Sequence, residues 1–171
     1  PTTITDGRGA TTTLCWDVDY TGAVIPTSHG NLTRTISPPP AGGQNPLVTL
    51  MKYDAKNNLL EVVAPKGVSN GGGVSCSTNL SSSINTLFAT DFTYDANGML
   101  LLSSTRRYTD PDLGQQTATT TFEYTDASNP GQPTWITPPR GNTGGSPDHS
   151  YAVNLTYSTS GSQAGMLQQS K

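Results

Sequence analysis

Few side chains in this 171-residue sequence could do acid–base or nucleophilic chemistry. His29 and His149 are its two histidines, and Asp148 directly precedes His149. Ser146 and Ser150 lie nearby, so the residue types of a serine hydrolase are present. The strained Gly-x-Ser-x-Gly turn that would expose a serine nucleophile does not occur. We therefore expect a solvated loop pair at Asp148 and His149, and we expect no catalytic residue and no enzyme activity.

Aspartates occur in pairs at short spacing, an arrangement that could bind a cation. The pairs are Asp17/Asp19, Asp91/Asp95 and Asp110/Asp112. Calcium needs several oxygens that converge on one point, and neither an EF-hand loop nor a glycine-rich calcium repeat is present. Aspartate also forms side-chain turns with the backbone that follows it. The pattern favours turns, and we expect no metal and no other cofactor.

The two cysteines, Cys15 and Cys76, are 61 positions apart and lack the spacing of metal ligands. The sequence is compatible both with two free thiols and with a disulfide between Cys15 and Cys76. The chain has 27 Thr and 17 Ser but few lysines, which favours a secreted or cell-surface protein. The net charge of −3, with nine scattered Lys and Arg, argues against nucleic-acid binding. No apolar run is long enough to cross a membrane as a helix.

The composition predicts an all-β fold. Leu, Ile, Val and Phe total only 30 residues, but just 12% of the chain is charged, so the low apolar content does not indicate disorder. Threonine is favoured in strands, and the 18 glycines and 13 prolines supply turns.

A short pattern recurs five times: an apolar residue, any residue, then an aromatic residue. The two large side chains of each copy would share one face of a strand. We predict that they form the core of a repeat, because a residue that recurs once per unit usually packs rather than binds sugar. The ten residues are Leu14, Trp16, Met51, Tyr53, Phe92, Tyr94, Phe122, Tyr124, Leu155 and Tyr157. Tyr20, Tyr108 and Tyr151 fall outside this spacing and are the candidates for exposed contacts.

Turn residues follow the aromatic residues, and a second apolar stretch then runs into a proline and a glycine. This order predicts serial antiparallel β-hairpins across a single run of residues 1–171. The units are a tail at 1–10, then 11–43, 47–73, 87–114 and 117–145, and a partial unit at 151–171. Because no polar capping unit is visible, we expect a piece of a much larger chain.

Two copies carry a recognisable motif. Tyr53-Asp-Ala-Lys-Asn-Asn-Leu-Leu and Tyr94-Asp-Ala-Asn-Gly-Met-Leu-Leu resemble the tyrosine–aspartate (YD) repeats of the RHS family. Trp16-Asp is a close variant, whereas Tyr124-Thr and Tyr157-Ser depart from the motif.

This resemblance implies a β-sheet that spirals around a hollow shell and, in bacterial members, encloses a toxic carboxy-terminal domain. The implied partners are neighbouring repeats of the parent chain and an enclosed effector. The implied location is outside a bacterial cell or on its surface. The self-cleaving segment of the family has no match here, so no catalytic residue carries over.

Two other functions remain open. An adhesin could bind glycan or protein through the loops at Val68–Ser83 and Asn142–Ser150. A polysaccharide-acting enzyme could use Asp110 and Asp112, because the separation of two carboxylates is set by the fold.

Overall fold

The structure is a computed structural model that describes residues 1–26, 30–40, 44–143 and 146–171. His29, one of the two histidines considered as candidate site residues, lies outside the described residues, as do the end of the predicted unit 11–43 and part of the candidate binding loop Asn142–Ser150. Across the described part the protein is all-β, as predicted, and the remaining regular segments are short 3₁₀ turns. No helix in this part is long and apolar enough to span a membrane.

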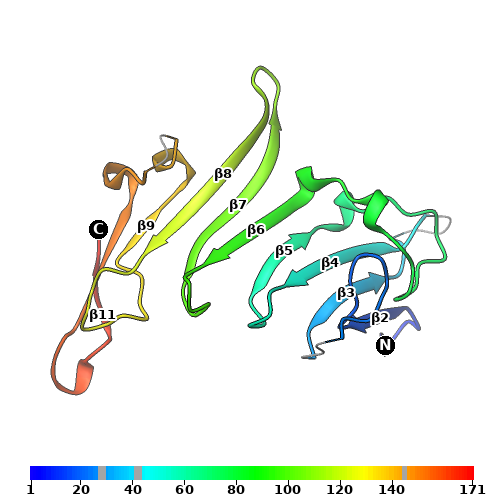
Figure 1. Cartoon of the computed structure of the whole chain (residues 1–171), viewed down its shortest axis with the longest axis horizontal. Helices are drawn as coiled ribbons and strands as arrows, with labels where there is room; N and C mark the ends of the chain where they lie inside the picture. The colour runs from blue at the N-terminus through cyan, green and yellow to red at the C-terminus, as the bar shows by residue number, and fades with distance from the viewer. Residues whose placement is uncertain (27–29, 41–43, 144–145) are drawn as a thin grey trace.

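Every strand pairs antiparallel with the next strand along the chain, which gives one open sheet (Figure 1). The two ends of the chain lie at opposite ends of this sheet. The strands are β1 (Thr2–Thr5), β2 (Thr11–Trp16), β3 (Leu32–Ser37), β4 (Leu47–Tyr53), β5 (Leu59–Val63), β6 (Ala89–Tyr94), β7 (Leu101–Asp110), β8 (Gly114–Glu123), β9 (Trp135–Thr137), β10 (Val153–Tyr157) and β11 (Leu167–Ser170). A chain of hairpins produces this order because each turn returns the chain beside the strand that it has just left.

A β-bulge recurs beside the aromatic residue of the repeat. The register of the sheet shifts next to Trp16, Tyr53, Tyr94 and Tyr157. In each case the extra residue lies on the returning strand: Thr33, Leu60, Leu102 and Gln168. Because a bulge increases the local right-handed twist, its repetition twists the sheet progressively from one hairpin to the next.

The fully buried core lies on one face of strands β2 to β6, which we call the covered face. Residues directly opposite each other on paired strands share a face. One row across this face contains Cys15, Arg34, Leu50, Val63 and Ala89, all of which are buried. Two segments between strands, residues 17–26 and 64–88, contribute Val18, Val68 and Leu80 to the same apolar cluster.

The ten residues that the sequence pattern marks as the repeat core lie outside this cluster. Nine are half-buried, and Trp16 is 41% exposed. Leu14 and Met51 directly neighbour Cys15 and Leu50 in their strands, so they lie on the opposite, open face. The most buried face is therefore not the one that the aromatic pattern marks, because the inserted segments fold over the other side of the sheet.

Candidate functional site

A disulfide joins Cys15 of β2 to Cys76 in the second inserted segment, with the two Cα atoms 5.4 Å apart. This result decides between the two alternatives that the sequence left open. Cys15 is fully buried, so the bond anchors residues 64–88 to the centre of the covered face. The spacing of 61 residues carries no signal for this pairing, because only the folded sheet brings the two positions together.

Arg34 of β3 holds the same segment through its guanidinium group. The side chain is fully buried, and Nη1 donates to the carbonyl oxygens of Ser75, Cys76 and Thr78 at 2.7, 3.1 and 3.0 Å. Nη2 donates to the carbonyl oxygen of Asp19 at 3.3 Å, which ties in the first inserted segment. Burial lowers the pKa of Arg34, and the negative charge of Asp19 opposes that effect. The cation thus satisfies carbonyl groups that would otherwise be buried without donors.

A second repeated device, which we call the clasp, follows β5 and recurs after β9. Its first half is a 3₁₀ turn of Pro, a basic residue and Gly, namely η1 (Pro65–Gly67) and η4 (Pro139–Gly141). Its second half is another 3₁₀ turn that is capped by Asn85 or Asp148, namely η3 (Thr86–Phe88) and η5 (His149–Tyr151). The two halves are joined by a backbone hydrogen bond from the capping residue to the glycine carbonyl, 2.7 Å in the first copy and 2.8 Å in the second.

The basic residue of each clasp lies over the aromatic residue of its second half. Lys66 is 5.0 Å from the ring centroid of Phe88, and Arg140 is 4.8 Å from that of Tyr151. A Cβ at Gly67 or Gly141 would collide with the facing backbone carbonyl at 2.9 Å, so both glycines are required by close packing. The sequence contained this signal as Pro-Lys-Gly and Pro-Arg-Gly, but the variable distance to the second half concealed it.

The side chain of His149 contacts Trp135 and Glu123 rather than the aspartate and serine of a serine-hydrolase triad. Its ring stacks on Trp135 with centroids 4.3 Å apart, and Nε2 lies 2.6 Å from Oε2 of Glu123. Asp148 does not orient the histidine, because its carboxylate caps η5 by accepting the N–H of Ser150. Neither Ser146 nor Ser150 contacts the imidazole within the described residues. The hydrolase arrangement is therefore not assembled in the part of the chain that the structure describes.

The paired aspartates do not converge on common points. Asp19, Asp95 and Asp110 accept backbone N–H groups of their own turns, whereas Asp91 forms an ion pair with Arg107 at 2.5 Å. Asp17 is buried and accepts backbone N–H groups from residues 30 and 31. Among the described residues no group of three or more His, Cys, Asp or Glu side chains could hold a metal ion.

The turn carboxylates make the stability of the sheet depend on pH. Asp95 accepts the N–H groups of Met99 and Leu100 at 2.7 and 2.8 Å, and these bonds lower its pKa. Because the pKa of Asp95 is lower in the folded than in the unfolded protein, the ionised carboxylate stabilises the fold. This stabilisation is fully present above the unfolded-state pKa of about 3.9 and is lost as the pH falls through the folded-state pKa. We therefore expect Asp95→Asn to lower the melting temperature at pH 7, and the difference from the wild type to vanish in strong acid.

Thermal unfolding followed by circular dichroism from pH 7 down to pH 2 measures this difference. The control is Asp112→Asn, with every curve recorded at low protein concentration, where the chain is monomeric. No hydrogen bond to the Asp112 carboxylate is found among the described residues, so removing this charge should leave the curve unchanged. An Asp95→Asn curve that runs parallel to the wild type down to the lowest pH would contradict the assignment.

Tyrosine hydroxyls connect successive hairpins. Tyr94, Tyr124 and Tyr157 donate to backbone carbonyl oxygens of residues 59, 101 and 133, at 3.1, 3.0 and 2.9 Å. Each bond reaches back 23 to 35 residues, so these predicted repeat positions link one hairpin to an earlier one. Partial burial raises the pKa of Tyr94 and Tyr124, which keeps both hydroxyls protonated as donors.

The three tyrosines predicted for exposed contacts fall into two groups. Tyr108 and Tyr151 are exposed to 47% and 43%, as expected. Tyr20 differs, because it is half-buried against the core cluster and its hydroxyl donates to Oε1 of Glu61 at 2.7 Å. Burial, strengthened by Glu61, raises the pKa of Tyr20 strongly, so this phenol serves as an internal donor.

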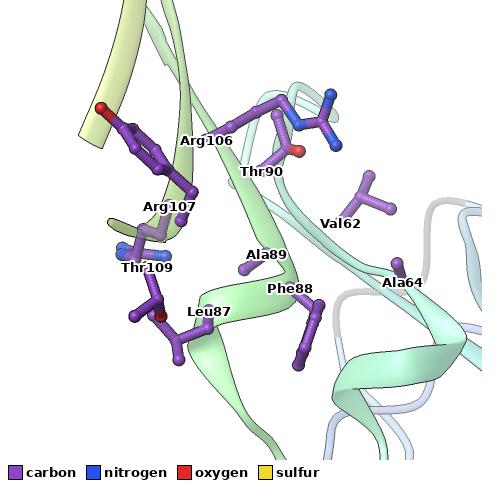
Figure 2. Close-up of a pocket in the computed structure, with 10 residues that line it drawn as sticks. Val62, Ala64, Leu87, Phe88, Ala89, Thr90, Arg106, Arg107 and Thr109 are labelled. Atoms are coloured by element: carbon purple, nitrogen blue, oxygen red, sulfur yellow. The ribbon is translucent and has the colours of Figure 1, made fainter. Parts of the chain in front are cut away.

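The candidate binding surface lies around the hairpin of β7 and β8, which has a hollow on each side. The first hollow, of about 460 Å³, is shown in Figure 2. Its lining is mainly apolar, with Val62, Leu87 and Phe88, and also includes Arg106 and Arg107. The second hollow, of about 490 Å³, lies beside β8 and is lined in part by Pro139, Arg140 and Asn142. Tyr108 lines both hollows, so this hairpin presents a mixed polar and apolar surface to a partner.

The comparisons with known proteins bear on the fold. No protein-family model matches the sequence, and no curated protein matches it. The structure is similar to the crystal structure of TcdB2-TccC3-TEV, with a TM-score of 0.50 and 14% sequence identity. The similarity covers 98% of this chain but only 8% of that chain. At this identity the similarity shows that the serial-hairpin sheet occurs in a solved structure as a small part of a far longer polypeptide.

Proposed function

We propose that this chain is a structural, non-catalytic segment of an RHS/YD-repeat shell in a secreted or cell-surface protein, where it helps to enclose or present an effector domain. The observation that carries the proposal is the strand order, in which eleven strands follow one another in one open sheet across the described residues. A sheet built in this way extends simply by adding hairpins at either end.

Three features of the sheet support the proposal that it forms part of the wall of a shell. All residues of both edge strands, β1 and β11, are exposed, and these strands leave a row of backbone groups available to further hairpins. The repeated bulges add twist at four of the hairpins, which suits a curved wall. The disulfide between Cys15 and Cys76 suits an oxidising location outside the cytoplasm.

The resemblance in sequence and the similarity in structure support the same family. In the motif beginning at Tyr94, Asp95 forms a side-chain turn, and Gly98 within that turn has a φ of 71°, which suits glycine. The fold is similar to part of TcdB2-TccC3-TEV and spans 8% of that chain. An effector encoded in the same parent chain, and a bacterial source, belong to this proposal.

The first test is the mass of the native polypeptide that carries this segment. An antibody against residues 1–171 should detect a band many times larger than 17.9 kDa on a denaturing gel of the source material. In the native particle, protease should spare a region beyond the segment and should digest it after heat denaturation. A band at 17.9 kDa, or equal digestion before and after heating, would contradict a shell.

Exposure of Tyr108 beside two hollows favours one second candidate, an adhesin-type module that binds glycan or protein. Tyr108→Ala should then abolish binding to an immobilised glycan, whereas Tyr53→Ala, at a half-buried repeat position, serves as the comparison. Retained binding in the Tyr108 variant would remove this candidate.

A further inference from the structure

The hairpin of β7 and β8 extends beyond the strands on either side of it. β7 pairs with β8 out to Asp110 and Gly114. β6 pairs with β7 only as far as Arg106, and β9 pairs with β8 only from Thr121. Figure 1 shows the tip of the hairpin projecting from the sheet. The outer part of β8 therefore has a strand on one side only.

The direction of the backbone groups along β8 follows from two hydrogen bonds. The carbonyl of Thr119 accepts Nδ2 of Asn142, and the carbonyl of Glu123 accepts the N–H of Thr134, so both point away from β7. Backbone direction alternates with a period of two, so the N–H and C=O groups of Gln115 and Thr117 point the same way. No strand pairs with these four groups within the described residues.

The residues of this edge lack the features that usually block strand pairing. The stretch Gly114–Thr120 reads Gly-Gln-Gln-Thr-Ala-Thr-Thr and contains no charge and no proline. Natural sheets normally protect an exposed edge with lysine, proline, a bulge or a covering segment. The other side of the hairpin is covered in this way, because Arg107 Nη1 donates to the carbonyl of Thr86 and η3 lies beside β7 (Figure 2).

We propose that the outer edge of β8 pairs antiparallel with the same edge of a second copy of this chain, around a twofold axis. The axis passes beside Gln116, so that Gln115 of each copy lies opposite Thr117 of the other. This register uses all four open backbone groups. A shift toward Thr119 would require its carbonyl, which Asn142 already occupies. Threonine and glutamine pairs across the interface introduce no like-charge repulsion.

The surfaces next to the edge complement each other in the same register. In this register the turn of one copy, with Leu113, lies at the end of the paired stretch next to Asn142 of the other copy, at the hollow that Arg140 lines. Leu113 is 72% exposed, and Asp112 beside it is also exposed. Arg140 has no ion pair among the described residues. The apolar and acidic tip of each copy thus meets an apolar and basic hollow of the other, which favours a second copy over an unrelated peptide.

The first experiment measures the mass of the full chain by sedimentation over a range of concentrations. We expect a reversible dimer whose affinity Thr117→Lys lowers by about tenfold or more. The two lysines, one from each copy, would be buried close together near the twofold axis and would repel each other. The Thr117 hydroxyl has no hydrogen bond among the described residues, and the substitution keeps the backbone N–H, so this change removes no hydrogen bond of the hairpin itself. The matched control is Ser170→Lys, which adds the same charge to the terminal edge strand β11 and should leave the dimer intact.

The second experiment reports the register directly. In the proposed pairing Gln116 lies opposite Gln116 of the second copy in a non-hydrogen-bonded pair, where Cα atoms are about 4.5 Å apart, within disulfide range. Gln116→Cys should therefore cross-link under mild oxidation. Ala118→Cys should not, because two strand positions displaced by four residues lie about 14 Å apart.

Three results would overturn the proposal. The chain could be monomeric at its highest soluble concentration. The lysine variants at positions 117 and 170 could weaken dimer formation equally, which would mean that the edge of β8 has no special part in the association. Equal cross-linking through positions 116 and 118 would mean that collisions, rather than a fixed register, bring the cysteines together.

Discussion

Replacing both Cys15 and Cys76 with alanine should lower the free energy of unfolding by about 4 kcal/mol. The disulfide closes a loop between residues 61 positions apart, and a loop of this size greatly restricts the unfolded chain. It also fixes residues 64–88 over the buried row of the covered face, so its loss exposes apolar side chains such as Leu80. The loss of this disulfide is the largest effect on stability that we expect in the chain.

Urea unfolding followed by tryptophan fluorescence measures the change as a shift in midpoint. The wild-type protein in reducing buffer is the matched comparison, because it should unfold near the midpoint of the alanine variant while retaining both sulfur atoms. A variant that unfolds at the wild-type midpoint in oxidising buffer would show that the bond does not form in solution.

Replacing Arg34 with methionine should cost about 3 kcal/mol, the second largest effect. Methionine fills a similar volume but leaves the carbonyl groups of Ser75, Cys76 and Thr78 without their shared donor. The control is Arg106→Met, which removes a cation from an exposed position of β7 and should change stability by less than about 0.5 kcal/mol. The same urea titration provides the measurement.

Hydrogen exchange gives this prediction a local readout. In the Arg34 variant, amides of residues 64–88 should exchange faster than in the wild type, while amides of the β7–β8 hairpin should be unaffected. Uniform acceleration across the whole sheet would mean that Arg34 supports the strands themselves. A midpoint equal to that of the Arg106 variant would contradict the proposed clamp.

The disulfide and Arg34 should not act independently, because both hold residues 75–78 against the sheet. Once the disulfide is absent, part of the segment is already displaced, so the Arg34 change should cost less than it does in the oxidised wild type. This coupling means that the two costs cannot simply be added to give the stability of the covered face.

Much of the fold could be predicted from sequence because it is encoded locally. The turn after Tyr94 needs only Asp95 to accept nearby N–H groups and Gly98 to adopt positive φ, and both occur as expected. Within each strand, side chains alternate between the two faces of the sheet, so which residues share a face also follows from the local sequence. The serial hairpins, their turns and the all-β class follow from such short-range rules.

The candidate site was less predictable. The positions of Tyr108 and Tyr151 outside the repeat correctly predicted that both are exposed. The same reasoning was wrong for Tyr20, which packs against the buried cluster and donates a hydrogen bond to Glu61. The clasp at Gly67 and Gly141 was also missed, since its two halves are separated by loops of different length.

By itself the sequence determined a run of hairpins and the face on which Leu14, Met51 and Phe92 lie. Only the tertiary structure decided that the opposite face holds the core, that Cys15 meets Cys76 and that Arg34 is buried. These contacts join residues about 40 to 60 positions apart through segments without periodicity. Local chemistry sets the path of each strand, but which loop folds over which face depends on the shape of the finished sheet.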